Sequence, residues 1–169
     1  MPRFSVALPL LSLLALAVSV ACSPASSGKT CSTYVVPAAT DLTTPAVSFK
    51  SDIVGNFFLN HCAFSGCHGD NDILFLGNSK ASGTVTNPAD VYANIVNVPS
   101  KELLTMPYVT PGNTTQSFLM HKVDGDNCMF AKQCKDQDCG DTMPRNNELL
   151  DVASRDLLRR WIAQGAKNN

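Results

Sequence analysis

Apolar residues in the middle of the chain recur at helical spacing. The pattern after residue 50 predicts a first helix over residues 51–63. Its apolar positions, which lie about one turn apart, are Ile53, Val54, Phe57 and Phe58. Cys62 extends the same face near the end of this helix, and a loop rich in Gly, Asn and Asp is predicted to follow over residues 66–83.

Two further helices are predicted from the residues at which they begin. Asn87 is suited to the N-cap, Pro88 to the first helical position and Asp90 to the first turn. A short third helix is predicted to start within residues 114–120, after a turn at residues 111–113.

The last helix has the clearest pattern. Ser154 is its predicted N-cap and Gly165 its predicted end. One apolar stripe along it consists of Leu157, Leu158, Trp161 and Ile162. We expect Trp161 to be a core residue that packs on the Phe57/Phe58 face of the first helix, which would bring the two ends of the domain together. The predicted fold class is therefore all-α, with long loops.

The first 21 residues have the pattern of a secretory signal. Arg3 supplies a positive charge, and residues 4–21 are mostly apolar. Pro9 inside this run disfavours a permanent membrane-spanning helix. We therefore expect residues 1–21 to be a signal peptide that is removed on export.

The end of this segment reads Val18-Ser19-Val20-Ala21-Cys22, which resembles the lipobox of bacterial lipoproteins. Ser19 departs from that pattern, in which leucine is usual. The resemblance implies a lipid on Cys22, and through it a membrane-anchored protein of the cell envelope at the periplasmic or outer-membrane face. The alternative is a soluble secretory signal cut after Ala21, with Cys22 as a free thiol or disulfide partner. In both cases the mature protein enters an oxidising compartment.

Composition changes between residues 22–50 and the rest of the chain. The first part is rich in Ser, Thr, Ala and Pro, which bury too little apolar surface to order a segment. Residues 22–50 are therefore predicted to be a flexible tether. Residues 51–169 are predicted to form one small folded domain.

Charge and motifs argue against several classes of function. A formal net charge of −1 gives no basis for electrostatic binding to nucleic acid. The cluster Arg155, Arg159 and Arg160 is predicted to be a solvated helix face. No Gly-rich phosphate loop follows a strand-like run, so no nucleotide site is predicted. The sequence has no recognisable catalytic constellation, so we predict that the protein is not an enzyme.

The residues from 61 to 69 carry the most specific chemistry. Covalent haem attachment uses two thiols that bond the vinyl groups of one porphyrin, and a histidine directly after the second thiol. Cys67 and His68 fit this arrangement. The first thiol does not, because Phe64 occupies its usual position and Cys62 lies two residues earlier, giving C-x4-C-H. The two extra residues must bulge outward if both bonds are to form.

Three landmarks occur in a characteristic order within residues 51–169. They are Gly66-Cys67-His68-Gly69, Met143-Pro144 and Trp161-Ile162-Ala163-Gln164-Gly165-Ala166. In this order they resemble the cytochrome c-like lipoproteins of bacteria. The resemblance implies a cytochrome c-like domain that binds haem c, with His68 as proximal and Met143 as distal iron ligand. It also implies electron transfer with a redox partner protein that the sequence does not identify.

A second Met-Pro pair, Met106-Pro107, offers an alternative distal ligand. Met143 is preferred because its place between Cys139 and the last helix matches the family. For either methionine, filling the core without binding iron is the simpler role and stays open.

The number of cysteines does not decide whether the protein binds haem. With Cys22 lipidated, six of the seven cysteines remain. If Cys62 and Cys67 hold haem, the other four form two disulfides; if they do not, all six can form three. Those other four are Cys31, Cys128, Cys134 and Cys139. Without haem, a Cys62–Cys67 bridge would replace the cofactor, and the protein would be a disulfide-stabilised binding or structural module.

Other polar features have simpler interpretations. A zinc or copper site made from His61, Cys62, Cys67 and His68 is a third possibility. Taken singly, His61 and His121 are predicted to face solvent. Residues 124–141 have three cysteines and no apolar face, so we expect this segment to depend on disulfides for its order.

Overall fold

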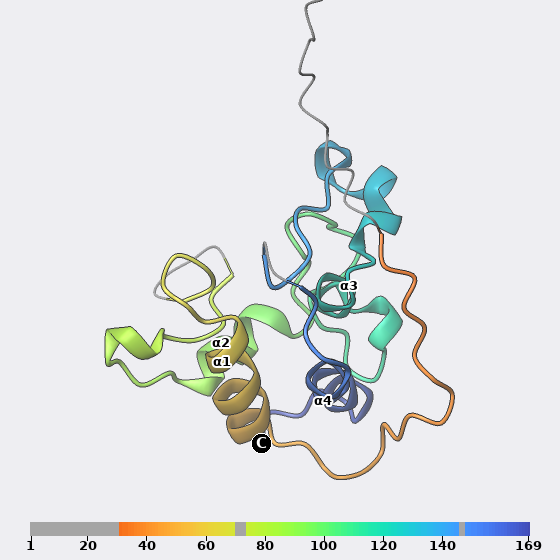
Figure 1. The fold of residues 1–169 in the computed structure, drawn as a ribbon. Coiled ribbons are helices and arrows are strands. Elements are labelled where there is room, and N and C mark those ends of the chain that lie inside the picture. The colour runs from red at the N-terminus through yellow and green to blue at the C-terminus, as the bar shows by residue number, and fades with distance from the viewer. Residues whose placement is uncertain (1–30, 70–73, 146–147) are drawn as a thin grey trace, which may run out of the picture.

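The computed structural model describes residues 31–69, 74–145 and 148–169. These residues form helices joined by long loops, with isolated β-bridges and no strand among them, which confirms the all-α prediction (Figure 1). The helices, named α where α-helical and η where π- or 3-10-helical, are η1 Phe49–Phe58 (π), α1 Leu59–His61, η2 Lys80–Ser82, α2 Pro88–Ile95, η3 Thr114–Gln116, α3 Phe118–Asp124, η4 Asn127–Gln133, η5 Lys135–Gln137 and α4 Val152–Ala163.

Residues 1–30 are not among those described, so the predicted signal peptide and lipid-bearing Cys22 lie outside them. In the part of the chain that is described, none of the helices is both long and apolar enough to span a membrane.

The predicted first helix is observed, with a wider helical geometry than expected. It is formed by η1 and α1 together, and η1 has π-helical hydrogen bonding. The hydroxyl of Ser48 caps it by accepting a hydrogen bond from the amide of Ser51. The face predicted to be apolar is fully buried and consists of Ile53, Val54, Phe57 and Phe58.

The second helix begins as predicted, whereas the third is divided. Asn87 caps α2, and its side chain accepts a hydrogen bond from the amide of Ala89. The third helix starts as η3, but Ser117 has extended backbone angles and separates η3 from α3. The helix then continues to Asp124 and ends at Gly125, whose φ of +77° suits glycine.

The cap of α4 differs from the prediction. Asp151, three residues before Ser154, is the N-cap, and its carboxylate accepts hydrogen bonds from both the amide and the hydroxyl of Ser154. A carboxylate also interacts favourably with the positive end of the helix dipole, so it is the stronger cap. Gly165 lies just beyond the end of α4, as predicted, with φ of +94°.

Trp161 is a core residue, as expected, with 1% of its surface exposed. Its helix, α4, packs on η1, but its aromatic partner is Phe49, with ring centroids 5.0 Å apart and not the predicted Phe57 or Phe58. The amides of Phe49 and Lys50 donate to the side chain and backbone oxygens of Asn169. The two ends of the domain therefore meet, as predicted.

The described part of the predicted tether, residues 31–50, is held against the domain. Cys31 is bonded to Cys128, and Val47 is buried. The side-chain amide of Gln164 bonds the backbone around Pro45, and Figure 1 shows the segment, in orange, running around α4 to η1. The prediction of a flexible tether over residues 22–50 is wrong for residues 31–50. This segment has no core of its own, but it is ordered on the surface of the folded domain.

Two of the three arginines predicted to form a solvated face are in fact buried and paired, whereas Arg160 is half-buried and donates to the backbone carbonyl of Asp41. Arg155 and Arg159 are 6% and 2% exposed, and each donates a hydrogen bond to one oxygen of Asp124, at 2.9 and 2.6 Å. The guanidinium of Arg155 also stacks on the Tyr34 ring, 4.1 Å from its centroid. Long-range pairing with the end of α3 removed these charges from solvent, which no helical pattern can indicate.

Candidate functional site

The loop with the C-x4-C-H motif is a compact turn that follows α1. The carbonyl of Cys62 accepts hydrogen bonds from the amides of Phe64, at 2.9 Å, and His68, at 3.3 Å. Ala63 points into the core, while residues 64–67 are exposed. Three of the four residues between the two cysteines, Phe64, Ser65 and Gly66, are therefore on the surface. The turn closes at Gly69, where a Cβ atom would lie only 3.0 Å from the carbonyl oxygen of Ala63.

The two thiols of this loop are unpaired and differ in environment. Cys62 is partly buried, and Cys67 is exposed. Burial raises the pKa of the Cys62 thiol to about 12, and the negative charge of a neighbouring Cys67 thiolate adds to the effect. Cys62 is thus a poor nucleophile in the chain as it stands.

The imidazole of His68 is oriented by the backbone. Its Nδ1 lies 3.1 Å from the carbonyl oxygen of Leu74. A carbonyl only accepts hydrogen bonds, so Nδ1 is the donor in this contact. Metal-binding histidines usually have such an outer hydrogen bond, because it fixes the tautomer and the ring orientation.

Met143 lies on the segment that precedes α4. It is partly buried against the core, and its amide donates to the carbonyl of Lys122 at 2.8 Å. In the view of Figure 1, this blue segment lies between α3 and the yellow loop that carries the cysteine motif. The alternative methionine, Met106, is 5% exposed and belongs to the core cluster.

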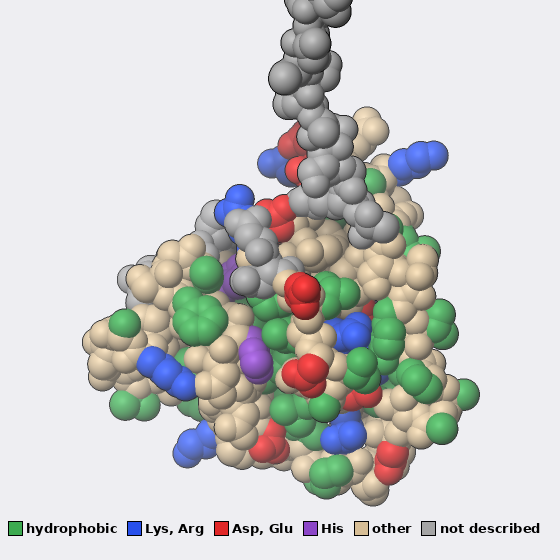
Figure 2. All heavy atoms as spheres, in the orientation of Figure 1, with side chains coloured by type: hydrophobic (Ala, Val, Ile, Leu, Met, Phe, Trp, Pro, Cys, Tyr) green, Lys and Arg blue, Asp and Glu red, His purple; other side chains and the backbone are tan. Residues whose placement is uncertain are grey.

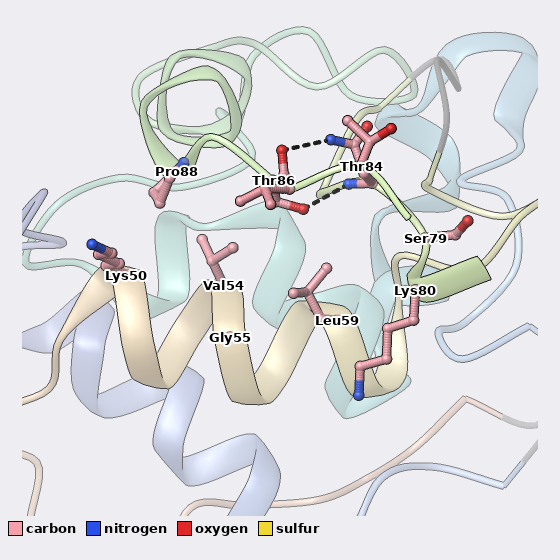
Figure 3. Close-up of a pocket in the computed structure, with 11 residues that line it drawn as sticks. Lys50, Val54, Gly55, Leu59, Ser79, Lys80, Thr84, Thr86 and Pro88 are labelled. Carbon is pink, nitrogen blue, oxygen red and sulfur yellow. Dashed lines mark hydrogen bonds between the residues drawn. The ribbon is translucent and has the colours of Figure 1, made fainter. Parts of the chain in front are cut away.

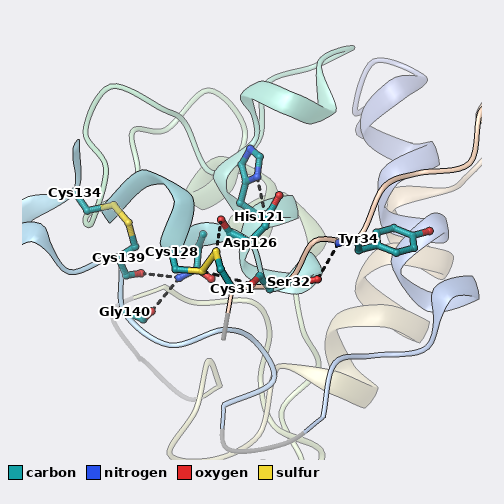
Figure 4. Close-up of a disulfide and its surroundings, with 11 residues drawn as sticks. Cys31, Ser32, Tyr34, His121, Asp126, Cys128, Cys134, Cys139 and Gly140 are labelled. Atoms are coloured by element: carbon teal, nitrogen blue, oxygen red, sulfur yellow. Dashed lines mark hydrogen bonds and ion pairs between the residues drawn. A yellow bond between two sulfur atoms is a disulfide. The ribbon is translucent and has the colours of Figure 1, made fainter. Parts of the chain in front are cut away.

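The other four described cysteines form two disulfides (Figure 4). Cys31 is bonded to Cys128, and Cys134 to Cys139. All three cysteines of residues 124–141 are therefore crosslinked, in keeping with the expectation that this segment depends on disulfides. The structure has no bridge between Cys62 and Cys67.

His121 is not the solvent-facing residue that was predicted. Its Nδ1 lies 2.9 Å from a carboxylate oxygen of Asp126, its Nε2 lies 3.1 Å from the carbonyl oxygen of Thr115, and its ring packs on Phe130. Although burial opposes protonation, hydrogen bonds to Asp126 and Thr115 and the nearby carboxylates raise the pKa of His121 overall. The partners of His121 lie on the two sides of α3, Thr115 before the helix and Asp126 after it, and the local sequence did not indicate this pairing.

The predicted zinc or copper site is not assembled. Among residues 31–69, 74–145 and 148–169, no group of three or more His, Cys, Asp or Glu side chains is arranged to hold a metal ion. The ring of His61 instead lies 5.6 Å from that of Phe57. His61, Cys62, Cys67 and His68 therefore do not form a metal centre in this conformation.

A pocket of about 240 Å³ lies between the first helix and the loop that precedes α2 (Figure 3). Val54, Gly55 and Leu59 line it from the helix, and Thr84–Thr86 and Pro88 line it from the facing loop. Neither the cysteine motif nor Met143 contributes to its lining, so it is separate from the candidate site.

Comparison of the chain with protein-family models, curated proteins and solved structures gives no match. The functional argument therefore depends on the residues of this chain. The sequence did not identify Lys122 of α3 or Asn127 of η4 as functional residues. Both hold the segment that carries Met143 by hydrogen bonds to residues 139–143.

Proposed function

We propose that this protein is an exported, membrane-anchored c-type cytochrome-like electron carrier that binds one haem. Cys62 and Cys67 would hold the porphyrin, and His68 and Met143 would bind its iron. The observation that carries the proposal is the selective pairing of cysteines: four described cysteines form disulfides, and the two beside His68 stay unpaired.

The disulfide pairing bears on the haem-free alternative, which the number of cysteines left open. Thiols of exported proteins are usually oxidised. A haem-free protein would be expected to bridge Cys62 and Cys67, whereas a haem protein needs both as thiols before attachment. The unpaired state of the two thiols favours the second account.

The donor chemistry of the remaining residues suits haem. The hydrogen bond from His68 Nδ1 to the carbonyl of Leu74 orients the imidazole, as the outer hydrogen bond of a metal-binding histidine does. Bound haem would supply a one-electron couple, and His68 and Met143 would hold it through an imidazole and a thioether, a combination that would raise its reduction potential. The chain's own part is to hold these two ligands and surround the ring with apolar side chains.

One face of the molecule has hydrophobic side chains close to histidine side chains. In Figure 2, hydrophobic side chains lie in the middle of the face beside histidine side chains, with acidic and basic side chains among them. A porphyrin ring, which is apolar and flat, is an occupant of suitable chemistry.

The location in the cell envelope is proposed from the sequence of residues 1–22. We infer that the signal is removed and that a lipid on Cys22 anchors the protein to a membrane. From Cys31 onward the chain is crosslinked to the domain, so the anchored domain would lie close to the membrane surface.

The test is expression in a periplasm that contains haem-maturation machinery, followed by a haem stain of a denaturing gel and a visible absorption spectrum. Wild type should stain and show a Soret band. Cys67→Ser should lose most covalent haem, and the neighbouring exposed change Ser65→Ala should not.

Methionine ligation is tested in the same preparation. Met143→Ala should change the spectrum at the iron while covalent haem is retained, whereas Met129→Ala, a change at an exposed methionine, should leave the spectrum as in wild type. A colourless wild-type protein that is fully folded would contradict the proposal and favour the haem-free binding or structural module.

A further inference from the structure

Lys122 is a charged residue in a buried position. Only 7% of its surface is exposed, although it lies in α3 of a small domain. Lysine is rarely buried unless its ammonium has compensating partners. Here Nζ donates a hydrogen bond of 2.6 Å to the carbonyl of Cys139 and lies 5.5 Å from the centroid of the Phe118 ring.

Lys122 also contacts the chain at Met143, four residues after Cys139. The backbone carbonyl of Lys122 accepts the amide hydrogen of Met143 at 2.8 Å. Lys122 therefore holds both ends of residues 139–143, one with its side chain and the other with its backbone. A short segment fixed at both ends has little freedom to move the side chain of Met143.

Neighbouring residues are arranged to allow this contact. Asn127, which is 2% exposed, donates from its side chain to the carbonyl of Gly140 at 3.0 Å and, less closely, to that of Cys139 at 3.4 Å. At Gly140, with φ of +68°, a Cβ atom would lie only 3.0 Å from Nζ of Lys122. Glycine thus lets the ammonium reach Cys139, which Figure 4 shows beside the Cys31–Cys128 disulfide.

We propose that Lys122 is a positioning residue that holds Met143 in place for axial ligation; this rests on the proposed function. A neutral thioether is a weak ligand compared with imidazole, so its place at the iron depends on how rigidly the protein presents it. The buried ammonium supplies that rigidity, because a hydrogen bond from a charged donor in a buried site is stronger than one between neutral groups.

The first measurement does not need haem. Hydrogen exchange of the Met143 amide is followed in wild type, Lys122→Met, Lys122→Arg and the control Lys132→Met, which alters an exposed lysine of η4. We expect exchange about tenfold faster or more in Lys122→Met, since a charged hydrogen bond is lost, partial recovery in Lys122→Arg and no change in the control. Amides of α4 should keep their protection.

The second measurement uses the haem-loaded protein. Lys122→Met should weaken the absorption band from thioether to ferric iron and lower the reduction potential, while the amount of covalent haem stays as in wild type. Asn127→Ala, which loosens the same segment without touching Lys122, should act in the same direction and gives a second test if Lys122→Met does not fold.

The outcomes separate this proposal from the proposed function. Wild type without haem would overturn the proposed function and the ligation step with it. Wild type with haem and a Lys122→Met protein with unchanged band, potential and Met143 exchange would overturn the role of Lys122 alone.

Discussion

Two regions of this domain use their cysteines in opposite ways. In residues 124–141, every cysteine is crosslinked, either within the segment or to Cys31. In the loop of residues 62–69, both cysteines are unpaired, although the chain brings them close enough for their charges to interact. Both regions belong to the same small domain, so the difference must come from local structure.

Packing explains the difference. Residues 124–141 form short 3-10 helices whose surface is mostly polar, so they bury little apolar area and gain order from crosslinks. The loop of residues 62–69 follows a helix whose aromatic face, Phe57 and Phe58, is completely buried. In this domain, disulfides are found in the region that buries little apolar area. The thiols of the loop are thus not needed for stability, which leaves them available for another use.

The largest effect is expected from the long disulfide. Cys31→Ser with Cys128→Ser opens a crosslink between residues 97 apart, which should lower the free energy of unfolding by about 4–5 kcal/mol in the chain-entropy estimate. Opening Cys134–Cys139, with a separation of 5, should cost about 2 kcal/mol. Urea unfolding of both variants checks the ranking, and equal losses would mean that loop closure does not explain them.

The next largest effect on stability is expected from the ion pairs that join α3 to α4. Asp124→Asn removes the carboxylate that pairs with the buried guanidinium group of Arg155 and leaves Arg159 only its ion pair with Asp156, which should cost about 3 kcal/mol. Urea unfolding against Asp136→Asn, the same change at an exposed position, measures it. A loss no larger than in the control would show that these arginines are stabilised mainly by stacking on Tyr34.

Local patterns predicted the fold well where neighbours in sequence decide it. The apolar face of the first helix, the Asn87 cap and the burial of Trp161 each depend on residues within a few positions. The cap at Asp151 was missed because a serine nearby also suits a cap. The burial of Arg155 was missed because its partner, Asp124, lies 31 residues away.

The candidate site was predictable as a set of residue types but not as an arrangement. Cys62, Cys67 and His68 are visible as a motif, and the unpaired state of the two thiols could not be derived because cysteine counts allowed two or three disulfides. Lys122 carries no local signal at all. Its role depends on residues 139–143 returning to α3, which only tertiary structure brings about.

A smaller, pH-dependent effect is expected at the end of α3, beside the crosslinked segment. The pKa of His121 is raised in the folded state, where the charged imidazole donates to Asp126 and Thr115. A raised pKa contributes stability that is fully present below the unfolded value of about 6.5 and is lost as pH rises through the folded value.

His121→Gln should therefore be less stable than wild type by about 1 kcal/mol at low pH, as for a typical hydrogen bond, and the gap should close as the solution becomes alkaline. Urea unfolding at several pH values checks this. A gap that is independent of pH would show that His121 acts through its packing on Phe130 and not through its charge.

The smallest effect on stability is expected in the cysteine loop, where it is most informative. Cys67→Ser changes an exposed, unpaired residue and should alter the free energy of unfolding by less than about 0.5 kcal/mol. In the folded, haem-free protein a thiol reagent should modify Cys67 alone. Burial raises the pKa of Cys62 to about 12, so its thiol stays protonated at pH 8 and reacts slowly.

Mass spectrometry of the labelled protein decides the matter. One label on Cys67, and a second on Cys62 only after unfolding, is the expected result. No label in either state would mean that Cys62 and Cys67 are bridged. The contrast between the two regions would then disappear, because all six cysteines would be crosslinks, and the thiols would no longer support haem attachment.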